Sequence, residues 1–314
     1  IVFGDWSSDV CSSDLSELVG VTALRAFLSP ESETALPAGA EGQEAELPPR
    51  ISALLDDLAS RSGGVVMTMG KGGVGKTTLA VTLATALARR GKSVHLTTTD
   101  PAAHVAQAVG QVPTGLKVSR IDPEVETEAY RQEVLATAGA ALDEEARALL
   151  EEDLRSPCTE EIAVFRAFAR IVAEGAEGFV VIDTAPTGHT LLLLDAAESY
   201  HREVSRSMNE IPEAVRQLLP RLRDPAFTRV FLVTLAEATP VHEALALQID
   251  LRRAGIEPAG WIVNQSLAPL EVRNPILKQR RLREFRYIDE VVRQAKSTWL
   301  EPWQAEPLAQ GNFA

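Results

Sequence analysis

Residues Met69–Thr78 read MGKGGVGKTT, and this stretch decides the fold. Gly70, Gly75, Lys76 and Thr77 satisfy the pattern G-x-x-x-x-G-K-[ST], directly after an apolar run and directly before a helical pattern. Glycines permit backbone angles that turn successive N–H groups towards one anion, and a helix N-terminus adds its dipole. The stretch therefore predicts a phosphate-binding loop (P-loop), in which Lys76 reaches the β- and γ-phosphates of a nucleotide and the Thr77 hydroxyl binds Mg²⁺.

The sequence around this loop is typical of an α/β protein. Helical patterns such as Thr77–Gly91 and Pro240–Gly255, each closed by a glycine, alternate with short apolar runs. This alternation predicts a doubly wound, mainly parallel sheet with helices on both faces. Residues 124–177 are mainly helical and too long for a plain crossover, so we expect a helical subdomain there. The predicted strands are Val65–Met69, Val94–Asp100, Phe179–Asp183, Val230–Thr234 and Gly260–Asn264.

Composition excludes several functions. The chain has 314 residues, 45% of them hydrophobic, and a formal net charge of −13. That charge argues against nucleic acid or anionic lipid as the main partner. Two cysteines cannot make a disulfide framework, which indicates a reducing compartment. No apolar run approaches the roughly 20 residues that span a bilayer, so any membrane role would be peripheral.

Two aspartates stand where predicted strands end. Asp100 closes VHLTTTD and Asp183 closes FVVID. A carboxylate at the carboxyl end of a parallel strand suits a loop that senses the γ-phosphate, although a turn or helix-cap aspartate is the plainer explanation for either one alone. The two together beside a P-loop favour a catalytic function. Lys71, the second lysine of the loop, is either a surface lysine or a residue that reaches a nucleotide in a facing subunit.

Four motifs together resemble one family, the arsenical pump-driving ATPases, and specifically their second, C-terminal half. They are GKGGVGKTT, DPAAH, DLRSPCTEEIAVF (153–165) and DTAPTGHTLLLLD (183–195), and the resemblance runs from about Ser16 to the end. It implies a deviant P-loop ATPase of two linked halves that hydrolyses MgATP when arsenite or antimonite binds. It also implies a cytoplasmic protein that drives an efflux channel at the inner face of the membrane, with a metallochaperone as a further possible partner.

The resemblance also implies roles for single residues. Asp100 would orient the attacking water, Asp183 would serve the Mg²⁺ site with Thr77, and Asn264 would read the adenine. Lys71 would cross to the other half's nucleotide. The nucleotide-binding loop would comprise Gly70, Lys71, Gly72, Gly73, Val74, Gly75, Lys76, Thr77 and Thr78.

The resemblance further implies that Ser156, Cys158 and His189 contribute to an As(III) or Sb(III) site between the halves. These metalloids are soft and favour thiolate, so one sulfur is apt and further thiolates would come from elsewhere. Read from the residues alone, Cys158 is more often a small buried side chain, and His189 could equally steady the second switch loop.

The N-terminus has a different explanation. DWSSDVCSSDL (5–15) resembles the translation of a common sequencing-library adapter, so we expect residues 1–15, with Cys11, to be an artefact. Residues 16–29 would then be the tail of a preceding ATPase half, and the Pro-, Ala-, Gly- and Glu-rich residues 30–50 a flexible linker. The P-loop ATPase domain would occupy residues 51–314, with the missing half or a second copy as its partner.

Other readings remain open at this point. A homodimeric ATPase that targets tail-anchored membrane proteins would want a Met-rich groove and often a paired-cysteine zinc site, whereas the chain has three methionines and no C-x-x-C. A partitioning-type regulator ATPase would want a basic patch or a terminal amphipathic helix. The chain could also be inactive without Lys71's counterpart from another half.

Overall fold

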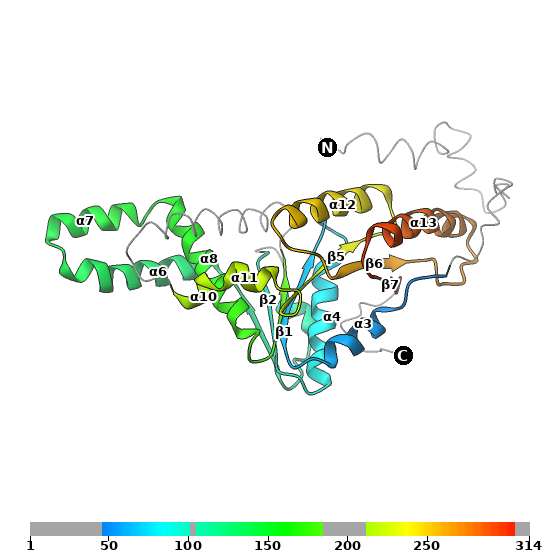
Figure 1. The fold of residues 1–314 in the computed structure, drawn as a ribbon, viewed down its shortest axis with the longest axis horizontal. Coiled ribbons are helices and arrows are strands. Elements are labelled where there is room, and N and C mark those ends of the chain that lie inside the picture. The colour runs from blue at the N-terminus through cyan, green and yellow to red at the C-terminus, as the bar shows by residue number, and fades with distance from the viewer. Residues whose placement is uncertain (1–45, 101–104, 185–211, 305–314) are drawn as a thin grey trace.

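The structure is a computed structural model that describes residues 46–100, 105–184 and 212–304. Within these residues one seven-stranded sheet has the order β3-β2-β4-β1-β5-β6-β7, and every pairing in it is parallel (Figure 1). The predicted α/β fold is therefore confirmed. The strands are β1 (Gly64–Met69), β2 (Val94–Thr98), β3 (Leu116–Arg120), β4 (Phe179–Asp183), β5 (Thr228–Thr234), β6 (Gly260–Ser266) and β7 (Thr298–Pro302).

Helices cover both faces of the sheet. Side chains of β1 alternate, because Val65 and Met67 pack into one apolar cluster and Val66 into another. The first cluster lies under α8 (Pro157–Glu174), α10 (Glu213–Arg216), α11 (Leu218–Arg223), α12 (Ala238–Arg253) and α13 (Pro275–Gln294). The second lies under α3 (Ile51–Ala59), α4 (Lys76–Arg89) and α5 (Val105–Val109).

Helix α4 directly follows the P-loop and is almost wholly buried. Its sequence KTTLAVTLATALAR is rich in alanine and leucine, which have high helix propensity and let the helix lie close to the sheet. It begins after Gly75, which has a left-handed backbone (φ +91°). Gly91 (φ +80°) follows the last turn of α4, and a glycine in this left-handed conformation commonly ends a helix. The first turn of α4 is thereby fixed at the carboxyl edge of β1.

A helical arm projects from one side of the sheet (Figure 1). It consists of α6 (Pro123–Thr137), the 3₁₀ turn η1 (Ala138–Ala141), α7 (Glu144–Asp153) and the start of α8. Arg166 and Arg170 of α8 pair with Glu133 and Glu126 of α6 at 2.7 and 2.6 Å. Between these two arginines in the sequence, Phe168 is buried in the core cluster that includes residues of β1 and β4. This helix is thus both part of the arm and the crossover into β4.

Two strands of the sheet carry no strong sequence signal. β3 (LKVSR) and β7 (TWLEP) lie at the two edges of the sheet and are only partly buried. An edge strand packs against fewer neighbours, so it has no continuous apolar run to announce it.

The predicted linker, residues 30–50, needs a correction at its C-terminal end. The Leu300 N–H donates a hydrogen bond to the Pro49 carbonyl (2.9 Å), and Arg50 forms a parallel bridge with Leu300. Leu47 also packs against the core. Folded structure therefore begins before Ile51, because β7 offers an edge for the incoming chain. The remainder of the linker, the predicted preceding tail and the predicted artefact lie outside the described residues.

None of the helices in the described part of the chain is both long enough and apolar enough to cross a membrane.

Candidate active site

The P-loop lies at the carboxyl edge of β1, between β4 and β5. Gly70 (φ +148°) and Gly75 (φ +91°) have backbone conformations that side chains rarely adopt. A Cβ on Gly70 would lie 2.3 Å from the Val233 carbonyl oxygen, and one on Gly75 would lie 2.2 Å from Asn264 Nδ2. Each position therefore requires glycine for two reasons: its backbone conformation, and the neighbouring atoms that leave no space for a Cβ. Gly72 and Gly73 are exposed, Val74 is buried, and Thr78 is half-buried in the first turn of α4.

Lys76 is the first residue of α4, and its side chain is buried. Its ammonium Nζ donates a hydrogen bond to the Lys71 carbonyl oxygen at 3.0 Å, so it lies back across the loop. Burial lowers the pKa of Lys76, while Asp183 and Asp100 act in the opposite direction. A phosphate group placed in the loop would give this cation a stronger partner than a carbonyl oxygen.

Asp183 closes β4 beside the P-loop and is 1% exposed. Its Oδ2 accepts hydrogen bonds from Thr77 Oγ1 (2.7 Å) and Thr98 Oγ1 (3.3 Å). Burial raises the pKa of Asp183, against the opposing effects of Thr77, Lys76 and Thr98. Burying an ionised carboxylate lowers the stability of the folded protein, and such carboxylates are common at sites that bind a ligand.

The donor set around Asp183 fits Mg²⁺. The second carboxylate oxygen, Oδ1, is buried and has no hydrogen-bond partner in the described structure. A carboxylate and a threonine hydroxyl 2.7 Å apart are hard oxygen ligands, the kind that Mg²⁺ takes in P-loop sites, where few protein ligands suffice. Thr77 and Asp183 are therefore the residues that would hold the ion.

Asp100 lies two residues beyond β2, at the same edge of the sheet. Its backbone N–H donates to Thr98 Oγ1 at 3.0 Å, and the same hydroxyl donates to Asp183. Its charge acts on both Lys76 and Asp183, which places it in their electrostatic neighbourhood. The structure thus brings together four residues expected in the site: Lys76, Thr77, Asp100 and Asp183.

Thr98 is a member of the site that the sequence analysis missed. It is buried, and its hydroxyl links the two strand-end aspartates: it accepts from the Asp100 backbone N–H and donates to the Asp183 carboxylate. The signal was the run TTTD at positions 97–100, where hydroxyl side chains end an otherwise apolar strand. A threonine in a buried strand is common, however, and the partner that joins this one to the site, Asp183, lies 85 residues away along the chain.

Asn264 lies next to the P-loop near the end of β6. Its side chain is 3% exposed and its Nδ2 donates to the Val74 carbonyl oxygen at 2.9 Å. The amide therefore braces the loop, which the sequence analysis did not foresee. This bond uses only one N–H of the amide. The amide oxygen and the second N–H of Asn264 could still form hydrogen bonds with a nucleotide base.

Lys71 forms an ion pair with a residue outside the P-loop. Its Nζ lies 2.9 Å from Glu243 Oε1 of α12, and both side chains are more than one third exposed. An exposed ion pair of this kind contributes about 1 kcal/mol at most. The expected reach of Lys71 into a facing subunit would therefore cost little.

The structure describes two of the three residues expected at a metalloid site, Ser156 and Cys158. Ser156 precedes the first turn of α8, where its Oγ lies 3.3 Å from Thr159 Oγ1. Cys158 is an exposed free thiol in that turn, so the alternative of a buried packing role is wrong. His189 lies outside the described residues. Within residues 46–100, 105–184 and 212–304, no three His, Cys, Asp or Glu side chains are grouped to hold a metal.

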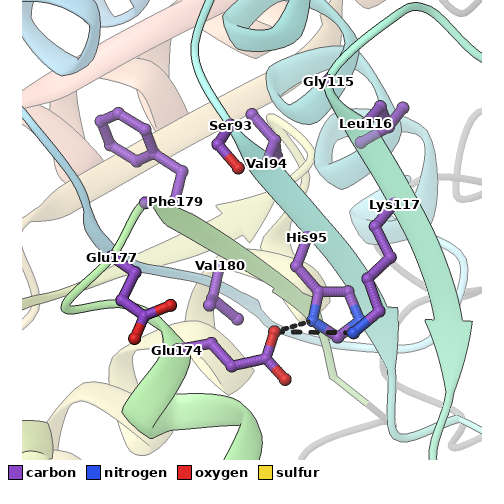
Figure 2. Close-up of a pocket in the computed structure, with 11 residues that line it drawn as sticks. Ser93, Val94, His95, Gly115, Leu116, Lys117, Glu174, Glu177, Phe179 and Val180 are labelled. Atoms are coloured by element: carbon purple, nitrogen blue, oxygen red, sulfur yellow. Dashed lines mark hydrogen bonds and ion pairs between the residues drawn. The ribbon is translucent and has the colours of Figure 1, made fainter.

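A separate cavity of about 490 Å³ lies at the amino ends of β2, β3 and β4 (Figure 2). There His95 Nδ1 is 2.6 Å from Glu174 Oε2, and Lys117 Nζ is 3.7 Å from the same oxygen. Burial lowers the pKa of His95, although Glu174 opposes the shift. Because the strands are parallel, this cavity is at the opposite end of the sheet from the P-loop and is not part of the nucleotide site.

A P-loop at a strand end beside the crevice of a doubly wound sheet, with a buried carboxylate hydrogen-bonded to the P-loop threonine, defines a P-loop nucleoside triphosphatase. Comparison with known proteins narrows the class. The sequence model of the anion-transporting ATPase family matches residues 64–209 and 194–298. This chain belongs to that family.

Individual relatives agree with the family match. The chain is 52% identical over 280 residues to an arsenical pump-driving ATPase of Escherichia coli, covering 89% of this chain and 48% of that protein. A protein of the same name from Acidiphilium multivorum is also 52% identical, over 88% of this chain and 47% of its own length. An ATPase ASNA1 homolog 1 of Paramecium tetraurelia is 26% identical, over 71% and 80%. The chain thus spans about half the length of the E. coli and A. multivorum relatives.

Proposed function

We propose that this chain hydrolyses MgATP as one half of a two-half ATPase that drives arsenite or antimonite extrusion. The observation that carries the proposal is the joining of the P-loop to the strand-end carboxylate, through the 2.7 Å hydrogen bond from Thr77 to Asp183. The 52% identity to arsenical pump-driving ATPases supports the choice of cargo.

Each residue of the site would have a distinct task. The N–H groups of the P-loop and the Lys76 ammonium would bind the phosphates, because the loop leads into the N-terminus of α4, which no side chain caps. Thr77 and Asp183 would hold Mg²⁺, which when bound neutralises charge on the phosphate oxygens. Asp100 would orient the attacking water, and Asn264 would contact the adenine while bracing Val74.

The rest of the catalytic unit would come from elsewhere. Lys71 would serve the nucleotide of the facing half, which is either the missing first half or a second copy of this chain. Ser156, Cys158 and His189 would supply this half's contribution to the metalloid site, with further thiolates from the partner. We propose a cytoplasmic protein that is peripheral at the inner face of the membrane when bound to its efflux channel, with a metallochaperone as a possible donor.

Nucleotide binding to Lys76→Ala tests the proposal at its root. Removing one partner of a buried charge pair costs about 2–5 kcal/mol, so the affinity for a fluorescent ATP analogue should fall by about 30-fold or more. Lys278→Ala, an exposed lysine of α13, is the matched control and should bind as the wild type does. Equal affinity of the Lys76 variant and the wild type would refute the P-loop assignment.

A further inference from the structure

Glu284 is a buried carboxylate that the proposed reaction does not use. It lies on α13 and is 3% exposed. One of its oxygens, Oε2, accepts three hydrogen bonds, from Ser266 Oγ (2.7 Å), Leu267 N (2.8 Å) and Ala268 N (3.2 Å). All three donors lie on the segment that leaves β6. The carboxylate therefore holds this one loop rather than capping its own helix.

The surroundings of Glu284 show that packing alone does not explain it. The Arg280 guanidinium lies 3.8 Å from its other oxygen, but that arginine is half exposed and also pairs with Glu237 at 2.9 Å. An apolar side chain of similar size would fill the same space without desolvating a charge. An acceptor at this point specifies one geometry for the loop, because an apolar residue would remove the acceptor of the Leu267 N–H and the Ser266 hydroxyl, whereas the Ala268 N–H would keep only its bond to Ser266 Oγ (3.1 Å).

The loop that Glu284 holds is continuous with the P-loop brace. Ser266 comes two residues after Asn264, whose amide donates to Val74 and lies against Gly75. Between them the pairing of β6 with β7 shifts register, and Gln265 adopts a left-handed conformation (φ +53°). Such a conformation is unfavourable for a residue with a side chain and persists only where its surroundings impose it.

The anchor points on either side of Gln265 are those surroundings. Asn264 is bonded to the P-loop, and Ser266 is bonded to Glu284 through its side chain and to the Trp303 N–H through its carbonyl oxygen (2.9 Å). A change at Glu284 would remove the side-chain bond of this C-terminal anchor and leave only the backbone bond to Trp303, so the end of β6 could relax. Asn264 would then shift relative to Val74.

We propose that Glu284 is a positioning residue of the nucleotide site: by holding the loop after β6 it keeps Asn264 against the P-loop in the geometry that binds nucleotide. The inference rests on the proposed function, since it concerns the site at Gly70–Thr78. Helix α13 contributes no residue to the predicted site, but through Glu284 it would affect the affinity for nucleotide.

The test compares Glu284→Met with Glu301→Met. Glu301, on β7, is also a buried glutamate (5% exposed) and accepts a hydrogen bond from Gln304, but it does not bind the β6 loop. Both variants should unfold more easily than the wild type in urea. Only Glu284→Met should lose affinity for a fluorescent ATP analogue, by about tenfold, because a small misplacement of a binding group is costly. Glu284→Gln, which keeps an acceptor oxygen, should restore most of the affinity.

The outcomes separate this inference from the proposed function. If the wild type binds the analogue and Lys76→Ala does not, while Glu284→Met binds like Glu301→Met, the positioning role is wrong and the nucleotide site stands. If the wild type and Lys76→Ala bind equally, the proposed function is wrong and the inference falls with it. A selective loss at Glu284 that glutamine restores supports the positioning role.

Discussion

Thr77 Oγ1 lies 2.7 Å from Asp183 Oδ2, across a sequence separation of 106 residues. The pair exists because β1 and β4 are neighbours in the sheet, with Thr68 opposite Asp183 in their register. The chain between them forms α4, β2, β3 and the helical arm. The helical arm is thus joined, through α8 and β4, to the carboxylate that touches the P-loop.

Asp183→Asn should separate stability from function. Burial raises the pKa of Asp183, so the folded protein holds its proton more tightly than the unfolded chain, and the ionised form costs stability above the unfolded pKa. The cost disappears as the pH falls through the folded pKa. The neutral amide should therefore raise the free energy of unfolding at neutral pH by about 0.5–2 kcal/mol.

Urea unfolding with and without MgATP measures both effects of Asp183→Asn. The wild type should be stabilised further by MgATP, because a ligand that binds only the folded state adds to stability. The variant should be more stable without ligand and should gain nothing from Mg²⁺. A variant that is less stable than the wild type at neutral pH, yet still responds to Mg²⁺, would contradict the assignment.

The alkaline limb of the pH profile should report Lys76. The ammonium form pairs with phosphate, and burial lowers the pKa of this group below its ordinary value of 10.5. The value of kcat/KM should therefore fall as the pH rises, with a midpoint below 10.5, since kcat/KM follows the free enzyme. Thermal unfolding at each pH checks that the protein remains folded. A midpoint at or above the ordinary value would show that Lys76 is not the titrating group.

Gly75→Ala and Gly73→Ala form a matched pair in the P-loop. Both residues have left-handed backbones (φ +91° and +83°), so either substitution should cost about 1–3 kcal/mol in strain. A Cβ at Gly75 would also lie 2.2 Å from Asn264 Nδ2, whereas one at Gly73 would meet nothing within 4 Å. Gly75→Ala should thus lose more stability and more affinity for ATP. Equal losses in urea unfolding and nucleotide titration would mean that Asn264 does not brace the loop.

Cys158→Ala should abolish stimulation by antimonite in the two-half protein, so that the ratio of stimulated to unstimulated ATPase rate falls to about one, because Sb(III) favours thiolate ligands. The thiol is exposed, so the substitution should change the free energy of unfolding by no more than about 0.5 kcal/mol. Glu160→Gln, on the same helix, is the control and should keep the stimulation. Stimulation that survives in Cys158→Ala would remove this residue from the metalloid site.

Local features of the sequence were enough for the P-loop and the central strands. Gly70 and Gly75 specify backbone conformations that other residues rarely adopt. The runs VVMTM and FVVID are each apolar at four of five positions, because both faces of a central parallel strand are buried. The edge strands β3 and β7 escaped prediction because each is only partly buried. Pro49 was placed in a linker since nothing local shows that β7 would pair with it.

Other features depend on positions brought together from distant parts of the chain. The roles of Thr98, Asn264 and Glu284 follow from partners 85, 190 and 18 residues away along the chain. A threonine, an asparagine and a glutamate carry no local mark of such partners. The sequence was therefore enough to predict which groups would bind phosphate, because a P-loop is a short-range arrangement of backbone and glycine. The order of the strands decided that Asp183 meets Thr77, and the packing of α13 decided that Glu284 holds the loop after β6. Both contacts connect distant residues because buried polar groups require hydrogen-bond partners.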